Sequence, residues 1–441
     1  MIDIIKRNRL KIWIVFYSLL TIYLSNELYS LNTSDWYRAT AAFLGDIPSF
    51  DSNIPLSYEL KKHFGGIYLF GYVSSYTYLL MGYAYFISLF TPYLDMMLLS
   101  SILKIILVIS LIKLYLQVSN KSSLLFLIIP IAFVITSSNM AILASFYQEQ
   151  VIIYIIPFIC LLLTKQSDNK SIIVTFILIT IISTTKSQFF YLSIIFLFSF
   201  LIFDRYNLKL KVLLTVLSIL LSISAILFST SATRINKYHA EYMGVYLLEK
   251  NNSMAINDSV DKNCIGVDSS GMIYNFENGA IATKMDSICY KKNEDSISFG
   301  NMIKEYLKNP KLILIMPFDK GILEQMTEDY FHVFKSIKII QGKGDVLRWI
   351  TNAKDMILKD IRFIFLMIVF ILSIIYRKNN ISPCFFILSS LGISQFYVSF
   401  FGEGYRDLSK HLFALNYSID MILFILISSG IGLIYRAINS K

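Results

Sequence analysis

Long apolar runs, each of about the length that crosses a lipid bilayer, recur along most of this chain. A helix needs roughly 20 apolar residues to cross the hydrocarbon core of a bilayer. Only 16% of the residues are charged, whereas soluble domains carry about 25%, so a soluble globular enzyme is excluded. The sequence therefore predicts an all-α polytopic membrane protein with about ten transmembrane helices. These cover residues 12–28, 96–117, 123–140, 150–164, 171–185, 188–203, 212–229, 360–376, 382–400 and 412–435.

Basic residues near the ends of these runs predict how the chain is oriented. Cytoplasmic loops are enriched in Lys and Arg, and the net charge is +10. If the N-terminus is cytoplasmic, the short basic loops fall on one face and the C-terminus is cytoplasmic too. Their positive residues are Lys113, Lys121, Lys165, Lys170, Arg205, Lys209, Lys211, Arg377, Lys378, Arg436 and Lys441. The positive excess thus indicates orientation, and we expect no nucleic-acid partner.

The short basic loops all fall on one face only if residues 66–95 do not cross the membrane. The segment is rich in Tyr, Ser and Gly, a composition typical of the membrane interface, so we predict interfacial or re-entrant helices there. Two large regions then face outward, a first loop over 29–95 and a loop domain over 230–357. The predicted modules are 1–229, 230–357 and 358–441. All four histidines lie on the outer face: His63, His239, His332 and His411.

Two of the four cysteines share the large outer loop. Cys264 and Cys289 would face an oxidising compartment, so they are candidates for a disulfide. Cys160 and Cys384 lie inside predicted spans as small apolar residues. No His or carboxylate group has convincing metal-ligand spacing. We expect no metal site and no required cofactor, with a divalent ion as an open alternative.

Ionisable groups at the outer ends of the spans are the candidates for a site. Asp35 and Arg38 directly follow the first span, and one helical turn would present them together as a base and a phosphate-binding guanidinium. Spacing alone favours the alternative, a helix start capped by Ser34 or Asp35 with a local ion pair. Lys61 and Lys62 would hold a lipid phosphate or, as we favour, snorkel to headgroups.

Two further groups of charges lie on the same face. Glu149 and Lys186 are nearly the only charges on the short outer turns, and a catalytic role is about as well supported as an ion pair between adjacent hairpins. The stretch GEGYRDLSKH, with Arg406, Lys410 and His411, is more charged than a connecting turn needs, which favours binding. Together these groups supply a base for an acceptor hydroxyl and cations for a departing phosphate.

This order of features resembles the GT-C glycosyltransferases, membrane enzymes that use polyprenyl-phosphate sugars outside the cytoplasmic membrane. Asp35 with Arg38 resembles the Asp-Glu-x-Arg element of the lipid A aminoarabinose transferases, but Trp36 stands at the second acidic position. Glu149 stands where that family has a second outer carboxylate. Lys186 resembles its Thr-Lys-Gly element, with Ser187 replacing Gly.

A nearly full-length resemblance is to the prophage-encoded serotype-conversion O-antigen glucosyltransferases of enteric bacteria. It rests on the stretches LNTSDWYRA, ASFYQEQ, NKYHAEY, YFHVFK and GISQFYVSFFGEGYRDLSKHLF. The resemblance implies a hexosyltransferase that moves glucose from undecaprenyl-phosphate glucose to a sugar of the lipopolysaccharide O-antigen. The reaction would occur on the periplasmic face of the bacterial inner membrane. Two functional partners are implied, a lipid-linked-glucose flippase and a bactoprenol glucosyltransferase.

We expect an inverting displacement with Asp35 as the general base; Glu149 orients the sugar or is itself the base. The loop that contains Tyr238 and His239 would roof the site. The residues expected to bind donor phosphate or substrate are Arg38, Lys61, Lys62, Lys186, Tyr238, His239, Arg406, Lys410 and His411. The alternatives are an O-antigen polymerase or ligase, a receptor-like protein, or a lipid-sugar transporter, for which mid-span charges would be expected.

Overall fold

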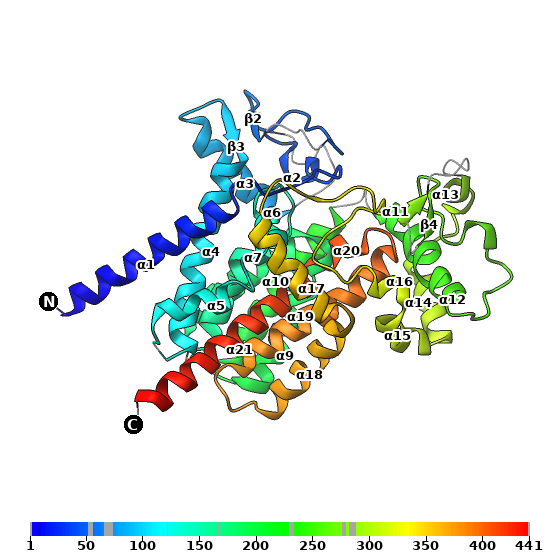
Figure 1. Ribbon diagram of the computed structural model, residues 1–441. Coiled ribbons are helices and arrows are strands. Elements are labelled where there is room, and N and C mark those ends of the chain that lie inside the picture. Colours follow the sequence, from blue (N-terminus) through cyan, green and yellow to red (C-terminus); the bar gives the residue numbers. More distant parts are fainter. Residues whose placement is uncertain are drawn as a thin grey trace.

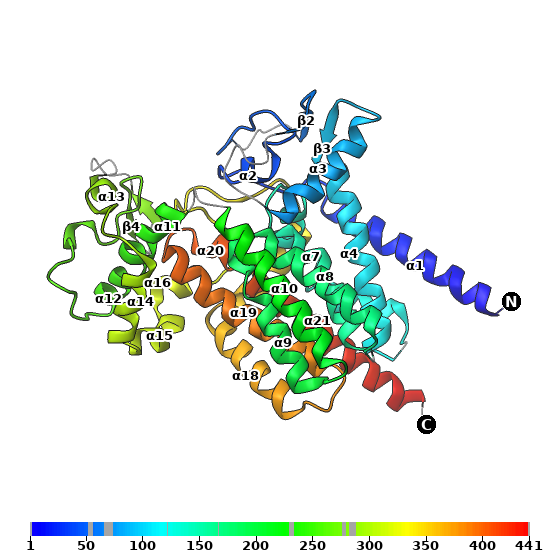
Figure 2. The same cartoon turned by 180° about the vertical axis from the view of Figure 1, so that it is seen from behind.

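The computed structural model describes residues 2–51, 56–65, 74–120, 122–165, 167–228, 233–275, 279–281 and 288–439. Most of this is helix, and the long helices run side by side as one bundle (Figure 1). The helix α1 (Ile2–Leu24) extends away from the bundle toward the N-terminus. Figures 1 and 2 both place the two termini at the end of the molecule away from the helices α11–α16 of the large loop.

Several helices of the bundle match the predicted spans. Within the described residues, four helices are long and apolar enough to cross a membrane: α4 (Met96–Val118), α10 (Leu208–Leu227), α19 (Ser382–Glu403) and α21 (Phe413–Asn439). Shorter helices cover other predicted runs: α7 (Gln150–Leu163), α8 (Asn169–Thr185), η3 (Ser187–Phe189) followed by α9 (Leu192–Phe203), and α18 (Arg362–Ile375). These helices confirm a mostly helical protein with segments that can cross a membrane. The count of about ten spans stays a prediction.

The run 123–140 does not form one continuous helix. It contains η2 (Leu124–Leu127), α5 (Ile128–Ile131) and, after a turn, α6 (Ser137–Leu143). Thr136 caps α6 by accepting a hydrogen bond from the N–H of Asn139. Pro130 has no N–H to donate to a helical ladder, and Ser and Thr side chains compete for backbone groups. Our expectation of a single helix here is therefore wrong.

A buried group of charges fixes this broken run to the rest of the bundle. Lys354 lies 2.9 Å from Glu328 and also pairs with Asp420, while Arg362 lies 3.3 Å from Glu328. We call these four residues the closed cluster; each of their side chains is at most 4% exposed. The run 123–140 supplies three of its hydrogen-bond partners, namely Asn139 Nδ2 to Asp420, Ser138 Oγ to Glu328 and the carbonyl of Phe133 to Lys354.

The first outer loop folds into short elements on the ends of the bundle. These are α2 (Tyr37–Thr40), β2 (Ser57–Glu59), α3 (Ser75–Ser88) and β3 (Tyr93–Asp95), and β2 pairs with β3 in antiparallel register. Of the predicted interfacial segment, residues 66–73 lie outside the described residues. Its helix α3 exposes Tyr85 and Phe86 while Tyr76 and Leu80 are buried, a pattern typical of a helix at the membrane interface.

The large outer loop forms short helices with little sheet. The strand β6 (Ile340–Gln341) pairs with β1 (Tyr29–Ser30), so the end of this loop is tied to the start of the first loop. Cys264 and Cys289 form a disulfide, with their Cα atoms 5.4 Å apart. The remaining elements are α11 (Thr233–Tyr238), η4 (His239–Val245), α12 (Tyr246–Asn251), η5 (Lys262–Cys264), β4 (Ile273–Asn275), β5 (Gly279–Ile281), α13 (Ile288–Asn293), α14 (Phe299–Lys308), α15 (Lys311–Ile315), η6 (Met316–Phe318), α16 (Lys320–Leu323), α17 (Asp345–Leu358), η7 (Lys359–Ile361) and, beyond α19, α20 (Leu408–His411).

Candidate active site

A cavity of about 450 Å³ lies where both outer regions meet the ends of the bundle helices. Four segments that are far apart in the sequence form its wall: the first outer loop, the turn after α8, the large loop and the link from α19 to α20. We call it the outer cavity. Its charged and polar lining includes Thr33, Ser34, Asp35, Arg38, Lys186, Gln188, Asn236, Ser269, Ser270, His332, Glu403, Arg406, Asp407, Lys410 and His411.

Asp35 is the carboxylate that the first loop brings to this cavity. Its Oδ2 accepts a hydrogen bond from Lys410 Nζ at 2.7 Å, and its Oδ1 lies 3.3 Å from Arg38. The local pair with Arg38 is the one expected from spacing. The expected cap is not formed, because α2 begins after Trp36 without a side-chain cap. Asp35 is therefore free to face the cavity and pair with Lys410.

The charge state of this pair follows from its surroundings. Burial alone would raise the pKa of the Asp35 carboxyl, but Lys410, Arg38 and Lys186 hold that pKa well below its ordinary value. Burial would lower the pKa of Lys410, and the carboxylates of Asp35 and Asp407 raise it above its ordinary value instead. Both groups are thus charged at neutral pH.

Trp36 explains how the loop that carries Asp35 is held. Its ring is fully buried and packs edge-on against Phe146 and Tyr147, with ring centroids 5.3 and 6.0 Å away. The hydroxyl of Tyr147 also lies 2.8 Å from Thr33 Oγ1. A large apolar ring at this position stabilises the loop by burial. The residue that replaces the second acid of the related motif therefore anchors Asp35 to the segment before α7.

Glu149 and Lys186 form the ion pair that was one of their two expected roles. Lys186 Nζ lies 2.6 Å from Glu149 Oε1. Burial alone would raise the pKa of Glu149, but Lys186 holds it below its ordinary value. The Glu149 side chain is 5% exposed, against 23% for Asp35. Lys186 and Asp35 line the cavity, with Glu149 behind Lys186, so the geometry favours Asp35 over Glu149 as the proton acceptor.

A glycine turn aims the last group of charges into the cavity. Gly404 has φ of +62°, and a Cβ atom there would lie 2.1 Å from the carbonyl oxygen of Met243. The neighbouring Tyr405 N–H donates to that same carbonyl at 2.9 Å. Only glycine fits this conformation and approach. The turn places Arg406 3.4 Å from Asp268 and leaves Arg406 on the cavity wall.

Three titratable lining residues were missed by the sequence analysis as candidates: His332, Glu403 and Asp407. His332 Nε2 lies 3.6 Å from Asp407 Oδ2, and His411 Nε2 lies 3.1 Å from Glu403 Oε2. Burial alone would raise the pKa of Asp407, but Lys410 and Arg406 hold that pKa below its ordinary value. Both acids lie in the charge-rich stretch already singled out, and that charge density was the available signal. His332 lies in the stretch YFHVFK, one of those that carry the family resemblance, and that stretch was the available signal for it.

Other predicted residues lie away from the lining. Lys61 donates to the carbonyl of Ala41 at 2.7 Å, and neither Lys61 nor Lys62 lines the outer cavity. Tyr238 is buried and stacks on Tyr242, with ring centroids 4.9 Å apart. These three residues are not brought to the cavity.

His239 supports the cavity wall from behind. Its Nε2 accepts a hydrogen bond from the N–H of Ser269 at 3.1 Å, and Ser269 lines the cavity. Burial, assisted by Arg406, lowers the pKa of His239 to about 3. A neutral imidazole is required, because a protonated one has no lone pair to accept with.

The cavity combines proton acceptors with a small excess of cations. Among the described residues, four Lys or Arg side chains and three carboxylates line it. Such a set can accept a proton and stabilise a phosphate. Within the same described ranges, no group of three or more His, Cys, Asp or Glu side chains is arranged to hold a metal ion.

Comparison with known proteins places the chain in a family. Residues 58–440 match the family described as the YfdI N-terminal transmembrane domain. The chain belongs to this YfdI family. It is similar to the uncharacterized protein YfdI of Escherichia coli (strain K12), with 41% identity over 419 residues that cover 94% of each chain. No solved structure matches the chain.

Membership of the YfdI family shows a membrane protein, in agreement with the long apolar helices. The family match begins at residue 58. It therefore includes Lys186, Arg406 and Lys410, while Asp35 and Arg38 lie before it.

Proposed function

We propose that the protein is a glucosyltransferase of the bacterial inner membrane. It moves glucose from undecaprenyl-phosphate glucose to the O-antigen repeat of lipopolysaccharide on the periplasmic face. One observation carries the proposal: a half-buried, ionised carboxylate, Asp35, meets Lys410, Lys186 and Arg406 around one cavity at the ends of apolar helices. Transfer of sugar from a membrane-anchored sugar phosphate requires a base that takes the hydroxyl proton and cations that stabilise the departing phosphate.

The proposed step is an inverting displacement at the anomeric carbon of the donor. The acceptor hydroxyl oxygen forms the new bond to this carbon as the bond to the phosphate oxygen breaks. The electron pair of the broken bond leaves with the phosphate, and the hydroxyl proton passes to the Asp35 carboxylate. Lys186, Lys410 and Arg406 stabilise the charge that grows on the phosphate. Arg38 holds Asp35 beside the acceptor.

The low pKa of Asp35 has a consequence for this step. A weakly basic carboxylate takes the proton late, as carbon–oxygen bond formation makes the hydroxyl acidic. The departing phosphate weakens the attraction between Lys410 and Asp35 by competing for the same ammonium. Asp35 therefore becomes more basic as Lys410 shifts its interaction from Asp35 to the departing phosphate.

The reaction requires a supply of donor on the outer face. We propose two functional partners, a bactoprenol glucosyltransferase that makes undecaprenyl-phosphate glucose and a flippase that carries it across the membrane. The large loop, 230–357, faces the O-antigen and selects the acceptor sugar. The full arrangement has about ten spans with both termini cytoplasmic.

The test replaces Asp35 by Asn in a strain that carries the partner proteins. We expect glucosylation of the O-antigen to fall by about 100-fold or more, measured by sugar composition of purified lipopolysaccharide and by transfer from radiolabelled undecaprenyl-phosphate glucose in membranes. Asp46→Asn, an exposed acid of the same loop, is the matched control and should keep full activity. Glucosylation retained by Asp35→Asn at equal protein level would exclude Asp35 as the base. A change in O-antigen chain length without added glucose would instead indicate a polymerase.

A further inference from the structure

A second cavity, of about 650 Å³, lies at the opposite ends of the helices that reach the outer cavity. Helix α7 starts beside Glu149, α8 ends beside Lys186 and α19 ends at Glu403, and the other ends of all three helices border the second cavity. These helices have 14, 17 and 22 residues. At about 1.5 Å per residue they separate the two cavities by roughly 20–30 Å. The two cavities therefore lie about one hydrocarbon thickness apart.

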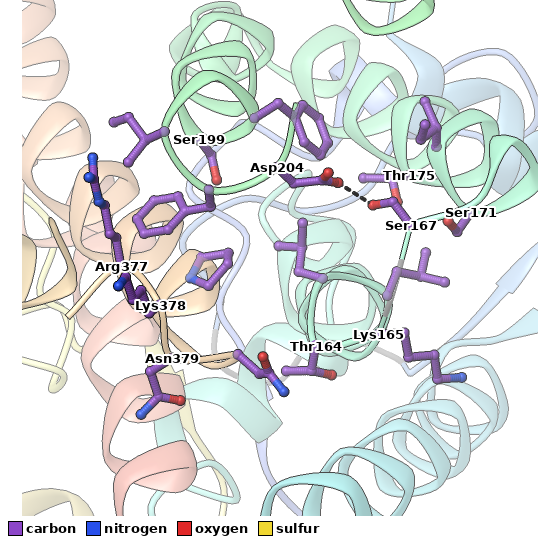
Figure 3. Close-up of a pocket in the computed structure, with 18 residues that line it drawn as sticks. Thr164, Lys165, Ser167, Ser171, Thr175, Ser199, Asp204, Arg377, Lys378 and Asn379 are labelled. Atoms are coloured by element: carbon purple, nitrogen blue, oxygen red, sulfur yellow. Dashed lines mark hydrogen bonds between the residues drawn. The ribbon is translucent and has the colours of Figure 1, made fainter. Parts of the chain in front are cut away.

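Three cations surround the mouth of the second cavity. Lys165 follows α7, and Arg377 and Lys378 follow α18; all three are exposed and line the cavity. Figure 3 shows Lys165 on one side of the cavity, with Arg377 and Lys378 across from it. Within the described ranges, none of the three lies within 4.0 Å of a carboxylate. Their charge is therefore available to a ligand.

The acid in this wall is already neutralised. Asp204 accepts a hydrogen bond from Ser167, drawn as a dashed line in Figure 3, and Lys211 Nζ lies 2.8 Å from its Oδ2. The Lys211 side chain is fully buried and its Nζ also donates to the carbonyl of Asp204, so Lys211 is committed to this acid. Asp204 thus does not cancel the cations at the mouth.

The interior of the cavity is different in character from its mouth. Phe200, Phe203 and Ile172 supply apolar surface, and Thr175 and Ser199 supply hydroxyls. An opening with cations at its mouth and apolar walls within matches an amphiphile whose charged end is anionic, because basic pockets between membrane helices bind anionic headgroups.

We propose that the second cavity binds the phosphate group of an anionic amphiphile. Lys165, Arg377 and Lys378 contact the phosphate, and Phe200 and Phe203 contact the hydrocarbon. The phosphate comes from a membrane lipid or from a free phosphate ester, and the experiment separates these sources. This site is independent of glucosyl transfer and stands or falls without it.

The experiment uses the full chain, purified in a mild detergent, with lipid binding measured by native mass spectrometry. The probes are phosphatidylglycerol, phosphatidylcholine and inorganic phosphate. The test variant is Lys165→Gln/Arg377→Gln/Lys378→Gln. The control variant, Lys170→Gln/Arg205→Gln/Lys209→Gln, removes three exposed cations at the same end of the bundle, and none of these is among the described residues that line the cavity.

We expect phosphatidylglycerol to bind the test variant about tenfold or more weakly than the wild type or the control. Phosphatidylcholine binding should not differ among the three proteins. If inorganic phosphate displaces phosphatidylglycerol at millimolar concentration, a free phosphate suffices; if it does not, the lipid is the ligand. Equal binding of phosphatidylglycerol to test variant and wild type overturns the proposal, as does an equal loss in the control.

A second measurement needs no variant and so does not depend on correct folding of one. Lysines of the wild-type chain are acylated with and without phosphatidylglycerol, and modified sites are quantified by mass spectrometry. We expect the lipid to slow acylation of Lys165 and Lys378 several-fold relative to Lys170 and Lys209. Equal rates at all four lysines would contradict the proposal.

Discussion

Two groups of buried charges in this molecule are built from the same residue types but differ in access. In the closed cluster, Lys354 and Arg362 neutralise Glu328 and Asp420, and every side chain is at most 4% exposed. Around the outer cavity, Asp35 and Arg406 are 23% and 24% exposed beside an open volume of about 450 Å³. The comparison teaches that burial and pairing alone do not mark a site. The charges must also border space for a ligand.

The largest effect should come from breaking the closed cluster. Lys354→Met removes the cation between Asp420 and Glu328, and an uncompensated buried charge costs about 3–5 kcal/mol. We expect a lower thermal unfolding temperature in detergent and poor accumulation in membranes. Lys359→Met is the control, because Lys359 pairs with Glu324 at the surface and should cost less than about 1 kcal/mol. Similar unfolding temperatures for the two variants would mean that the closed cluster does not stabilise the fold.

At the outer cavity, the corresponding change should affect binding more than stability. Lys186→Ala removes a cation from the cavity wall, and a charged hydrogen bond is worth about 1.5–3 kcal/mol, or about 10- to 100-fold in affinity. We expect the apparent affinity for undecaprenyl-phosphate glucose to fall by this factor. Lys62→Ala, a cation outside the cavity, should have no such effect.

The same variant leaves Glu149 without its partner, so a folding defect must be separated from a binding defect. Lys186→Ala/Glu149→Gln removes both charges of the pair. We expect this double variant to regain stability while its affinity for the donor stays low. An unchanged donor affinity in either variant would remove Lys186 from the phosphate site.

An intermediate effect concerns the pH dependence of stability and the histidine behind the cavity wall. The pKa of His239 falls from an ordinary value of about 6.5 to about 3 in the fold. The unfolded chain therefore binds a proton that the folded chain does not, and stability is lost as pH falls below about 6.5. Between pH 7 and pH 5 His239 alone accounts for a loss of about 2 kcal/mol, and His332, whose pKa burial also lowers, adds a loss of the same sign. The Asp35 and Asp407 carboxylates contribute no change in this window, because their ordinary pKa is near 4.

The measurement is thermal unfolding at pH 7 and pH 5 of the wild type and of His239→Gln. The Gln side chain can accept from the Ser269 N–H in place of Nε2 and does not titrate. We expect a smaller acid shift in the variant. An acid shift of wild-type size in His239→Gln would contradict the assignment.

The smallest effect should come from Arg38. Its pair with Asp35 is 28% and 23% exposed at 3.3 Å, so Arg38→Gln should change the free energy of unfolding by less than about 1 kcal/mol. Glucosyl transfer should fall only a few-fold, because Lys410 still holds Asp35. A loss of activity as large as that of Asp35→Asn would show that Arg38 itself contacts the reacting groups.

Sequence patterns predicted the helical membrane fold where apolar residues dominate. Run length and composition located α4, α10, α19 and α21, because lipid imposes one solution on an uninterrupted apolar segment. The prediction was wrong at 123–140, whose hydropathy resembles that of the other runs. There Asn139 and Ser138 donate hydrogen bonds to Asp420 and Glu328 of the closed cluster. The local sequence does not show that these acceptors, which lie in distant segments, will be close in the fold.

The lining of the outer cavity was predicted only in part, because here too the partners lie far apart in the sequence. Asp35, Lys186, Arg406, Lys410 and His411 line the cavity as a group of scarce outer charges should. Which charge meets which could not be predicted, because the 2.7 Å contact between Asp35 and Lys410 joins residues 375 positions apart. Lys61 and Lys62 are equally basic but do not line the cavity. The charge of a residue does not tell where the fold places it.

The glycine turn at Gly404 fixes the spacing between two segments beside the outer cavity without any side chain. The backbone at Gly404 lies directly on the backbone of Met243 and Gly244, so the large loop and the end of α19 meet at bare main chain. Main-chain dimensions are the same in every protein, whereas lining side chains vary from one sequence to another. A change of lining side chains therefore leaves the distance between these two segments as it is. Backbone contact fixes the spacing here, and side chains only fill the space that it leaves.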